Sequence, residues 1–295
     1  MTAELILDAR NGTGESPVWS TAEQALYWVD IPAHRLHRWN LADGYSQSWE
    51  ADEMLACIVR SSDGNWIGGM QSGLFALTPH TNGRLETRLL SSVPHALPDM
   101  RFNDGRCDRQ GRFWAGTMHL DMAAGHAVGA LYRYSAGQRE PLKAQISGLT
   151  VPNGLAFSPD GTLMYLSDSH PDVQKIWAFD YDTDTATPRN RRVFVDMKEH
   201  PGRPDGAAID ADGCYWICGN DAGLVHRFTP EGKLDCSLAV PVKKPAMCAF
   251  GGADLDTLFV TSIRLAGDIS DQPLAGGVFA LRPGVKGLPE PEFTT

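Results

Sequence analysis

The chain has 295 residues, of which 42% are hydrophobic and 21% are charged, and it contains 30 glycines and 19 prolines. This composition is typical of a globular protein rich in turns, and it excludes a disordered chain and a helical bundle. The formal net charge of −10 argues against nucleic acid and anionic membrane surfaces as partners, because affinity for phosphate groups comes from Lys and Arg.

The N-terminus and the cysteines indicate a cytoplasmic protein. Residues 1–10 carry acids within a short apolar run, which does not resemble a secretory signal, and no apolar run approaches the length that spans a membrane. The six cysteines are scattered and too sparse for a disulfide scaffold, so we expect them to be reduced.

A pattern of three short strands recurs six times along the chain. Each copy contains an apolar strand, a turn, a strand with an aromatic residue, a second turn and an alternating strand. In chain order the copies cover residues 16–39, 57–77, 105–134, 151–180, 206–228 and 247–281. The second strand of each copy carries an anchor aromatic: Trp28, Trp66, Trp114, Tyr165, Trp216 and Phe259.

The spacing of these anchors predicts the fold. Successive anchors are 38, 48, 51, 51 and 43 residues apart, which is close to the blade length of four-stranded propellers. Apolar stretches such as 192–195 supply a fourth, outer strand, and Asp160-Gly161 suits a tight hairpin turn. We predict an all-β protein with a single domain over residues 1–295, a six-bladed β-propeller with four antiparallel strands per blade. Residues 4–7 are expected to pair in the last blade and to close the ring.

Polar residues stand at the start of four of the six innermost strands. Counting back 11 to 13 residues from the anchors of blades one, three, four and five reaches Glu15, Asn103, Asn153 and Asp205. The same count in blades two and six reaches the apolar Leu55 and Met247. Because innermost strands line the channel, the four polar side chains should converge at one mouth.

Two interpretations of these residues stay open. Asn or Asp before Gly is a common turn signal, which explains Asn103, Asn153 and Asp205 equally well as turn residues. Glu15 has no turn preference, and burial in the channel would leave its carboxylate without compensation unless something pairs with it. Two carboxylates and amides around one axis indicate one divalent metal ion, Ca²⁺, Mg²⁺, Mn²⁺ or Zn²⁺, and oxygen ligands favour the first three over a structural zinc.

Six ordered motifs resemble those of a known family. They are residues 14–19 (Gly-Glu-Ser-Pro-Val-Trp), 101–105 (Arg-Phe-Asn-Asp-Gly), 116–118 (Gly-Thr-Met), 152–160 (Pro-Asn-Gly-Leu-Ala-Phe-Ser-Pro-Asp), 204–206 (Pro-Asp-Gly) and 276–279 (Gly-Gly-Val-Phe). Together they resemble the senescence marker protein (regucalcin)/gluconolactonase family over essentially the whole chain.

The resemblance implies a six-bladed lactonase with one divalent metal at the mouth of the channel. It implies that the metal is held by Glu15, Asn153 and Asp205, three of the four polar residues that the register selects. It further implies that Arg101 and Asn103 contact the substrate, and that an acid shortly after the Gly-Thr-Met motif reaches the sugar hydroxyls. Asp121 is the candidate for that acid. It is one methylene shorter than the glutamate of animal members, so the resemblance does not settle the preferred sugar.

The expected chemistry follows from these parts. A divalent ion can polarise a lactone carbonyl or acidify a bound water, and Asp205 is the expected general base. We interpret Asp104 as a residue that supports the site or its turn rather than a direct catalyst. His119 could also support the site, although a solvated loop histidine is the simpler interpretation, and residues 119–128 form either a lid or a surface loop.

We therefore expect a metal-dependent hydrolase that opens an aldonolactone such as glucono-, xylono-, galactono- or arabinonolactone. Its expected partner is a small-molecule sugar lactone. The expected assembly is a monomer or a weak dimer. Two alternatives remain: an organophosphate or aryl-ester hydrolase, and a non-enzymatic propeller that binds Ca²⁺. The absence of a Gly-x-Ser-x-Gly motif disfavours a serine esterase.

Overall fold

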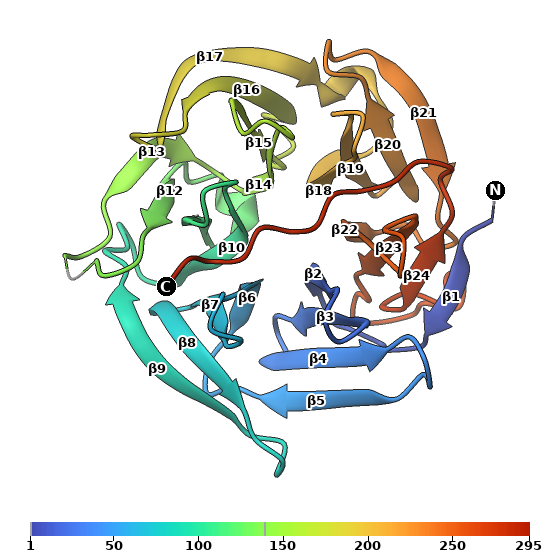
Figure 1. The fold of residues 1–295 in the computed structure, drawn as a ribbon. Helices are drawn as coiled ribbons and strands as arrows, with labels where there is room; N and C mark the ends of the chain where they lie inside the picture. The colour runs from blue at the N-terminus through green and yellow to red at the C-terminus, as the bar shows by residue number, and fades with distance from the viewer. Residues whose placement is uncertain (1, 139) are drawn as a thin grey trace.

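Six four-stranded antiparallel sheets surround a central axis in the computed structural model, which describes residues 2–138 and 140–295 (Figure 1). Each anchor aromatic lies in the second strand of its sheet and is at most 2% exposed. Large aromatic side chains at these positions fill the space between neighbouring blades, which is why the repeat forms a ring. The predicted six-bladed propeller is confirmed.

The first three blades each run from the innermost to the outermost strand in chain order. Blade 1 contains β2 (Gly14–Ser20), β3 (Ala25–Asp30), β4 (Arg35–Asn40) and β5 (Ser46–Glu50). Blade 2 contains β6 (Leu55–Arg60), β7 (Trp66–Met70), β8 (Gly73–Pro79) and β9 (Leu85–Ser92). Blade 3 contains β10 (Met100–Cys107), β11 (Phe113–His119), β12 (Gly129–Tyr134) and β13 (Ala144–Leu149), with the short 3-10 helix η1 (Met122–Ala124) after β11.

The remaining blades follow the same plan until the ring closes. Blade 4 contains β14 (Pro152–Phe157), β15 (Leu163–Asp168), β16 (Lys175–Asp182) and β17 (Thr187–Asp196), followed by the 3-10 helix η2 (Met197–Glu199). Blade 5 contains β18 (Arg203–Ile209), β19 (Tyr215–Asn220), β20 (Leu224–Phe228) and β21 (Leu234–Ala239). Blade 6 contains β22 (Pro245–Gly251), β23 (Thr257–Ser262), β24 (Val278–Leu281) and β1 (Glu4–Leu7). Neither helix in the described residues is long and apolar enough to cross a membrane.

The N-terminal strand closes the ring. β1 is the outermost strand of blade 6, where Glu4 pairs with Ala280 and Leu5 with Phe279 in antiparallel register. The first strand of the chain therefore shares a sheet with its last three strands, which closes the ring. The expected role of residues 4–7 is confirmed.

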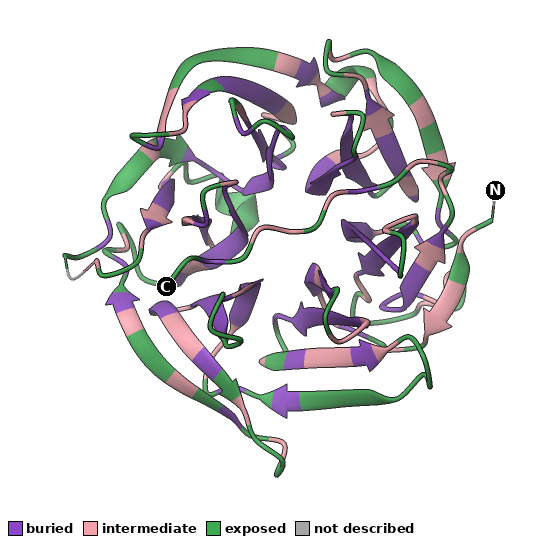
Figure 2. Cartoon of the chain, viewed as in Figure 1, coloured by how far each residue is buried: buried purple, intermediate pink, exposed green. Residues whose placement is uncertain are grey.

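Burial decreases from the channel outwards (Figure 2). All six residues of β3 are buried, whereas only Trp49 of the outer strand β5 is. The hydrophobic core lies between adjacent blades: the rings of Tyr27 and Trp66 are 4.4 Å apart, and those of Trp19 and Phe259 are 5.3 Å apart. This packing leaves the channel as the place where polar groups collect.

A β-bulge interrupts every innermost strand near its start. In blade 1 the register shifts between Glu15 and Val18, and in blade 4 between Asn153 and Ala156. The corresponding shifts in the other blades fall at 55–57, 102–105, 204–207 and 245–248. Because a bulge bends its strand and re-aims the local side chains, these positions are where the chain can turn polar groups into the channel mouth.

The C-terminal segment crosses the ring after β24, a feature that the sequence pattern did not predict. Figure 1 shows this segment running across the face of the propeller and ending near β10. Backbone bridges attach it on the way, Gly287 to Asp210 of blade 5 and Phe293 to Ser61 of blade 2. One end of the channel is therefore covered by the chain itself.

Candidate metal and substrate site

Glu15 lies buried at the start of β2, and the backbone beside it is strained. Among the described residues, only the N–H of Ser16 donates to its carboxylate, at 3.1 Å. Burial and the negative charges of Asp205 and Asp104 raise the pKa of Glu15 well above its usual range. Ser16 has φ of +48°, a left-handed conformation that costs energy outside glycine and is found where a site demands it. Glu15 is thus a buried acid that lacks a neutralising partner.

Asp205 is the second buried acid and lies in the bulge of β18. Asn220, at the end of β19, donates its Nδ2 to Asp205 Oδ2 at 2.6 Å. Burial nevertheless raises the pKa of Asp205 to about 7, even though Asn220, Arg203 and Lys244 act in the opposite direction. The negative charge of Asp205 acts on Glu15, so the two carboxylates lie within electrostatic range of one another, near the starts of β18 and β2.

Amides from two blades form a chain of hydrogen bonds beside these acids. Asn103 donates its Nδ2 to Asn153 Oδ1 at 3.1 Å and to the Pro152 carbonyl at 2.9 Å. Asn153 donates its own Nδ2 to Ser169 Oγ at 2.7 Å, and that hydroxyl donates to the Pro204 carbonyl beside Asp205. The amide of Asn153 is therefore held with its oxygen in a fixed direction, and blades 3, 4 and 5 are joined at the mouth.

Arg101 extends the network on the side of blade 3. Its Nη1 donates to Asn103 Oδ1 at 2.8 Å and to the Phe102 carbonyl at 2.7 Å. Burial lowers the pKa of Arg101 to about 10, against the attraction of Glu15 and Asp205, so the guanidinium lies within electrostatic reach of both acids. Of the residues predicted to touch substrate, the structure brings Arg101 and Asn103 to the predicted ligands.

Asp104 lies beside this network and faces blade 4. Its Oδ2 accepts the backbone N–H of Leu155 at 2.8 Å, two residues after Asn153, while its buried Oδ1 has no partner among the described residues. This contact holds the bulge of β14 against β10, as expected of a residue that supports the site. A direct role in the reaction is not required by this geometry.

Asp121 and His119 lie further out: His119 is the last residue of β11, and Asp121 lies on the loop that follows. Asp121 is exposed, and its Oδ1 accepts the backbone N–H groups of Ala123 and Ala124 at the start of η1. His119 Nδ1 accepts the Asp121 N–H at 3.2 Å, and its ring meets that of His126 edge-on. The substrate role of Asp121 and the supporting role of His119 stay predictions, because neither side chain contacts the buried acids.

The buried oxygens fit a divalent cation. Within the described residues, Glu15 and Asp205 form no ion pair, and together they carry the two negative charges that such an ion would offset. Carboxylate and amide oxygens are the donors that hard cations prefer. No three His, Cys, Asp or Glu side chains in the described parts of the chain lie close enough to hold a metal, so the predicted set depends on Asn153 as its third ligand.

Four residues that support the mouth were not predicted from the sequence: Ser169, Arg203, Asn220 and Lys244. For Arg203, the repeat pattern does carry a signal. Arg203 and Arg101 occupy equivalent positions of β18 and β10, since Arg203 pairs with Asn220 and Arg101 with Met118 ahead of matching bulges. The other three come from strand ends and turns of neighbouring blades, where the repeat pattern carries no information.

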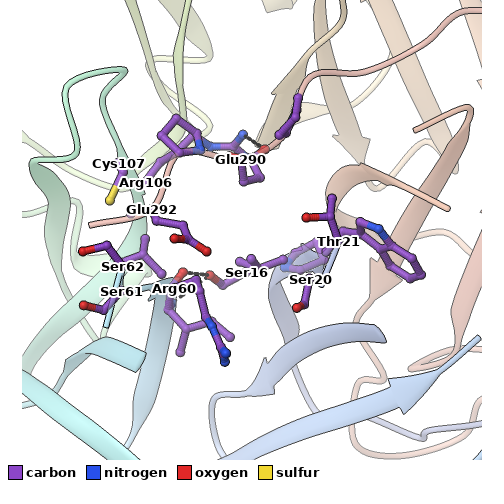
Figure 3. A pocket seen from close by; sticks show the side chains of 18 of the residues that line it. Ser16, Ser20, Thr21, Arg60, Ser61, Ser62, Arg106, Cys107, Glu290 and Glu292 are labelled. Atoms are coloured by element: carbon purple, nitrogen blue, oxygen red, sulfur yellow. Dashed lines mark hydrogen bonds and ion pairs between the residues drawn. The ribbon is translucent and has the colours of Figure 1, made fainter. Parts of the chain in front are cut away.

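The opposite end of the channel holds a different kind of cavity. It has a volume of about 120 Å³ and is lined by the ends of β2, β6 and β10 and by the C-terminal segment (Figure 3). There Arg106 pairs with Glu290 at 2.5 Å and donates to the Ala207 carbonyl at 2.6 Å. Because the innermost strands start at the first mouth and end here, the covered cavity is not the predicted site.

The family profile described as SMP-30/Gluconolactonase/LRE-like region matches residues 13–264. The chain belongs to the SMP-30/gluconolactonase family. The resemblance drawn from its six motifs is therefore confirmed, and the predicted ligands Glu15, Asn153 and Asp205 all fall inside the matched region.

Relatives of the family align along almost the whole chain. A 6-deoxy-6-sulfogluconolactonase from Pseudomonas putida is 42% identical over 95% of this chain and 94% of its own, and a pentonolactonase from Haloferax volcanii is 31% identical over 98% and 97%. The solved structure of a calcium-binding protein, regucalcin, from Agrobacterium tumefaciens superposes with a TM-score of 0.91 at 29% identity, covering 99% of this chain and 97% of that one. The lactonases among these relatives are hydrolases of carboxylic esters, the enzyme class expected from the sequence.

Proposed function

We propose that this protein is a metal-dependent lactonase that hydrolyses a sugar lactone to the corresponding aldonic acid. The observation that carries the proposal is the convergence of two buried acids, Glu15 and Asp205, with the fixed amide of Asn153 at one channel mouth. Lactonase relatives that align over nearly the whole chain support the same reaction.

Glu15, Asn153 and Asp205 would hold one divalent ion through their oxygens. When bound, such an ion polarises the lactone carbonyl and lowers the pKa of a water that it contacts. The chain contributes the fixed geometry. Ser169 orients the amide of Asn153, and Asn220 orients the carboxylate of Asp205 through a hydrogen bond of 2.6 Å. Ligands held in this way need little rearrangement on binding.

Asp205 is the proposed general base. Asn220 occupies Oδ2, and no group in the described residues donates to Oδ1, which is therefore free to accept a proton from the attacking water. General bases in this position contribute roughly 10²- to 10⁴-fold to a rate. The proton held on Asp205 can then be returned to the ring oxygen that leaves as the lactone opens.

Arg101 and Asn103 are the proposed substrate contacts beside the ligands. Arg101 can only donate hydrogen bonds, while Asn103 can donate and accept, so the pair can orient a carbonyl or hydroxyl group of the sugar. Asp121, on the exposed loop after β11, is proposed to accept from sugar hydroxyls further from the reacting carbon. This arrangement suits aldonolactones as substrates, such as glucono-, xylono-, galactono- or arabinonolactone.

Hydrolysis of a panel of aldonolactones tests the proposal. The protein is stripped with a chelator and reloaded with Ca²⁺, Mg²⁺, Mn²⁺ or Zn²⁺ in turn, and acid release is followed by pH indicator. We expect activity that disappears with the chelator and returns with at least one ion. Full activity in the stripped protein would overturn the metal-dependent mechanism.

Two further outcomes separate the alternatives. Turnover of paraoxon or an aryl ester above that of every sugar lactone would favour an organophosphate or aryl-ester hydrolase. Metal binding without turnover of any lactone, together with an Asp205→Asn variant that behaves like the parent, would favour a non-enzymatic Ca²⁺-binding propeller.

A further inference from the structure

Two basic residues share one acid at the rim of the candidate site. Arg203 is the first residue of β18, and Lys244 directly precedes β22, so the two come from neighbouring blades at the end of the channel where Asp205 lies. Arg203 Nε contacts Asp221 Oδ2 at 2.7 Å, and Lys244 Nζ contacts the other oxygen of the same carboxylate. One negative charge thus compensates two positive charges.

Each of these cations lies two hydrogen bonds from a proposed metal ligand. Lys244 donates to Asn220 Oδ1 at 3.4 Å, and Asn220 in turn donates to Asp205. Arg203 donates to the carbonyl of Ser169 at 3.4 Å, and the hydroxyl of Ser169 accepts from Asn153. A group that extends from a bound lactone by a few bonds would therefore reach them.

The two side chains remain accessible to solvent. Arg203 is 24% exposed and Lys244 is 18% exposed, while Asp221 between them is 42% exposed. Asp221 can therefore leave the pair for water without breaking a buried contact. The two cations can then change partner, which a sealed structural ion pair cannot do.

The charge balance of the mouth favours an anion. In the ionised form that a bound cation favours, Glu15, Asp104 and Asp205 carry three negative charges that act on one another, and Asp221 adds a fourth. Arg101, Arg203 and Lys244 supply three positive charges. A divalent ion, as the proposed function requires, would turn the excess negative charge into one net positive charge. Arg203 and Lys244 are only partly exposed, so this excess is screened less than it would be at an open surface.

We propose that Arg203 and Lys244 form an oxyanion subsite, and that the preferred substrate is a lactone carrying a sulfonate, phosphate or carboxylate group. This inference rests on the proposed lactonase function and adds to it the chemical class of the substrate. The planar guanidinium offers two parallel donors to such a group, and the ammonium offers a compact charge beside it. Asp221 is the counter-ion that the substrate displaces.

The test compares matched lactones on the metal-loaded full-length protein. Glucono-1,5-lactone is the neutral substrate, and its 6-phospho and 6-deoxy-6-sulfo analogues carry an oxyanion at the same carbon. Rates are corrected for spontaneous hydrolysis. We expect at least one anionic lactone to have a kcat/KM about tenfold above the neutral one, and the ratio to fall as salt rises because screening weakens the attraction. The two analogues separate a phosphate site from a sulfonate site.

Variants assign the preference to the named residues. In Arg203→Met and Lys244→Met the ratio of anionic to neutral kcat/KM should fall about tenfold. Asp221→Asn should change it in the opposite direction, since Asn keeps the left-handed backbone at this position, φ of +76°, while removing the competing charge. Lys243→Met is the matched control, because Lys243 pairs with Asp271 on the exposed surface and should leave the ratio unchanged.

The outcomes distinguish this inference from the proposed function. Turnover of neutral lactones with no anionic preference, or a preference that is unchanged in both Arg203→Met and Lys244→Met, would overturn the oxyanion subsite alone. Absence of turnover of every lactone would overturn the lactonase function and the subsite with it. If either Met variant fails to fold, Asp221→Asn still decides the question, because its expected effect is an increase.

Discussion

The two ends of the channel bury charged groups in opposite ways. At the far end Arg106 and Glu290 form a direct ion pair of 2.5 Å, and the C-terminal segment covers them (Figure 3). At the mouth Glu15 and Asp205 are buried without any direct ion pair among the described residues. A buried charge is tolerated when it is paired, so the ion pair at the far end needs no explanation beyond the stability of the fold.

The unpaired end is not explained by folding alone. Burial raises the pKa of Glu15 well above its usual range and that of Asp205 to about 7, so both acids destabilise the fold at neutral pH in their charged form. Such a cost persists where it serves a site. We therefore propose that the mouth binds the ligand and that the far end is a structural closure.

The largest expected effect is loss of activity at the mouth. Asp205→Asn removes a metal-ligand charge and the base, so kcat/KM for the best lactone should fall by at least about 10³-fold, within the range for loss of a general base. Steady-state hydrolysis measures this. Glu290→Gln is the matched control at the far end and should stay within about threefold. Similar losses in the two variants would contradict the distinction between the two ends.

The next effect is on stability at the far end. Arg106→Met leaves the half-buried Glu290 without its partner, and the free energy of unfolding should fall by about 2 kcal/mol. Urea denaturation measures it. The double variant Arg106→Met/Glu290→Gln should recover much of the loss, because no uncompensated charge remains. A double variant as unstable as the single one would show that the ion pair is not the reason for the arrangement.

A smaller effect links metal binding to pH. A carboxyl whose pKa is raised on folding contributes stability at acid pH, and this stability is lost as the pH rises. The metal-free protein should therefore become less stable between pH 4 and about 7, the range in which Asp205 ionises. A bound cation reverses this by compensating the charges. The increase in Tm on adding excess metal should therefore be larger at pH 8 than at pH 5, by a few degrees.

Scanning calorimetry of chelator-treated protein, with and without added ion, measures the increase in Tm at pH 5 and at pH 8. The pH dependence should survive in Glu290→Gln and weaken in Asp205→Asn. Equal increments at the two pH values in the parent protein would argue against ionised carboxylates as the metal ligands.

The smallest expected effect concerns the exposed loop beside the mouth. Asp121→Ala should raise KM for the sugar lactone by roughly two- to fivefold with little change in kcat, since an exposed side chain adds a modest hydrogen bond. Asp172→Ala, on a neighbouring exposed loop, is the control. An unchanged KM in Asp121→Ala would remove Asp121 from the substrate site and leave it as the cap of η1.

Much of the fold could be predicted because it depends on short-range periodicity. Alternating strands, Gly turns and one buried aromatic per copy repeat along the chain, and each constrains only its own blade and the next. Glu15 stood out because no local preference explains a glutamate at that position. The candidate site residues Asn103, Asn153 and Asp205 followed from the same count, and each lies at or beside the bulge of its innermost strand.

The sequence by itself determined the number of blades, the closure of the ring by residues 4–7 and the strands whose starts carry polar groups. Only the tertiary structure decided that Ser169 and Asn220 orient the proposed ligands, that Lys244 joins Arg203 across two blades, and that the C-terminal segment covers the far end. The physical reason is distance along the chain. Repeats are encoded in neighbouring residues, whereas contacts between turns of different blades exist only after the curvature of the closed ring brings them together.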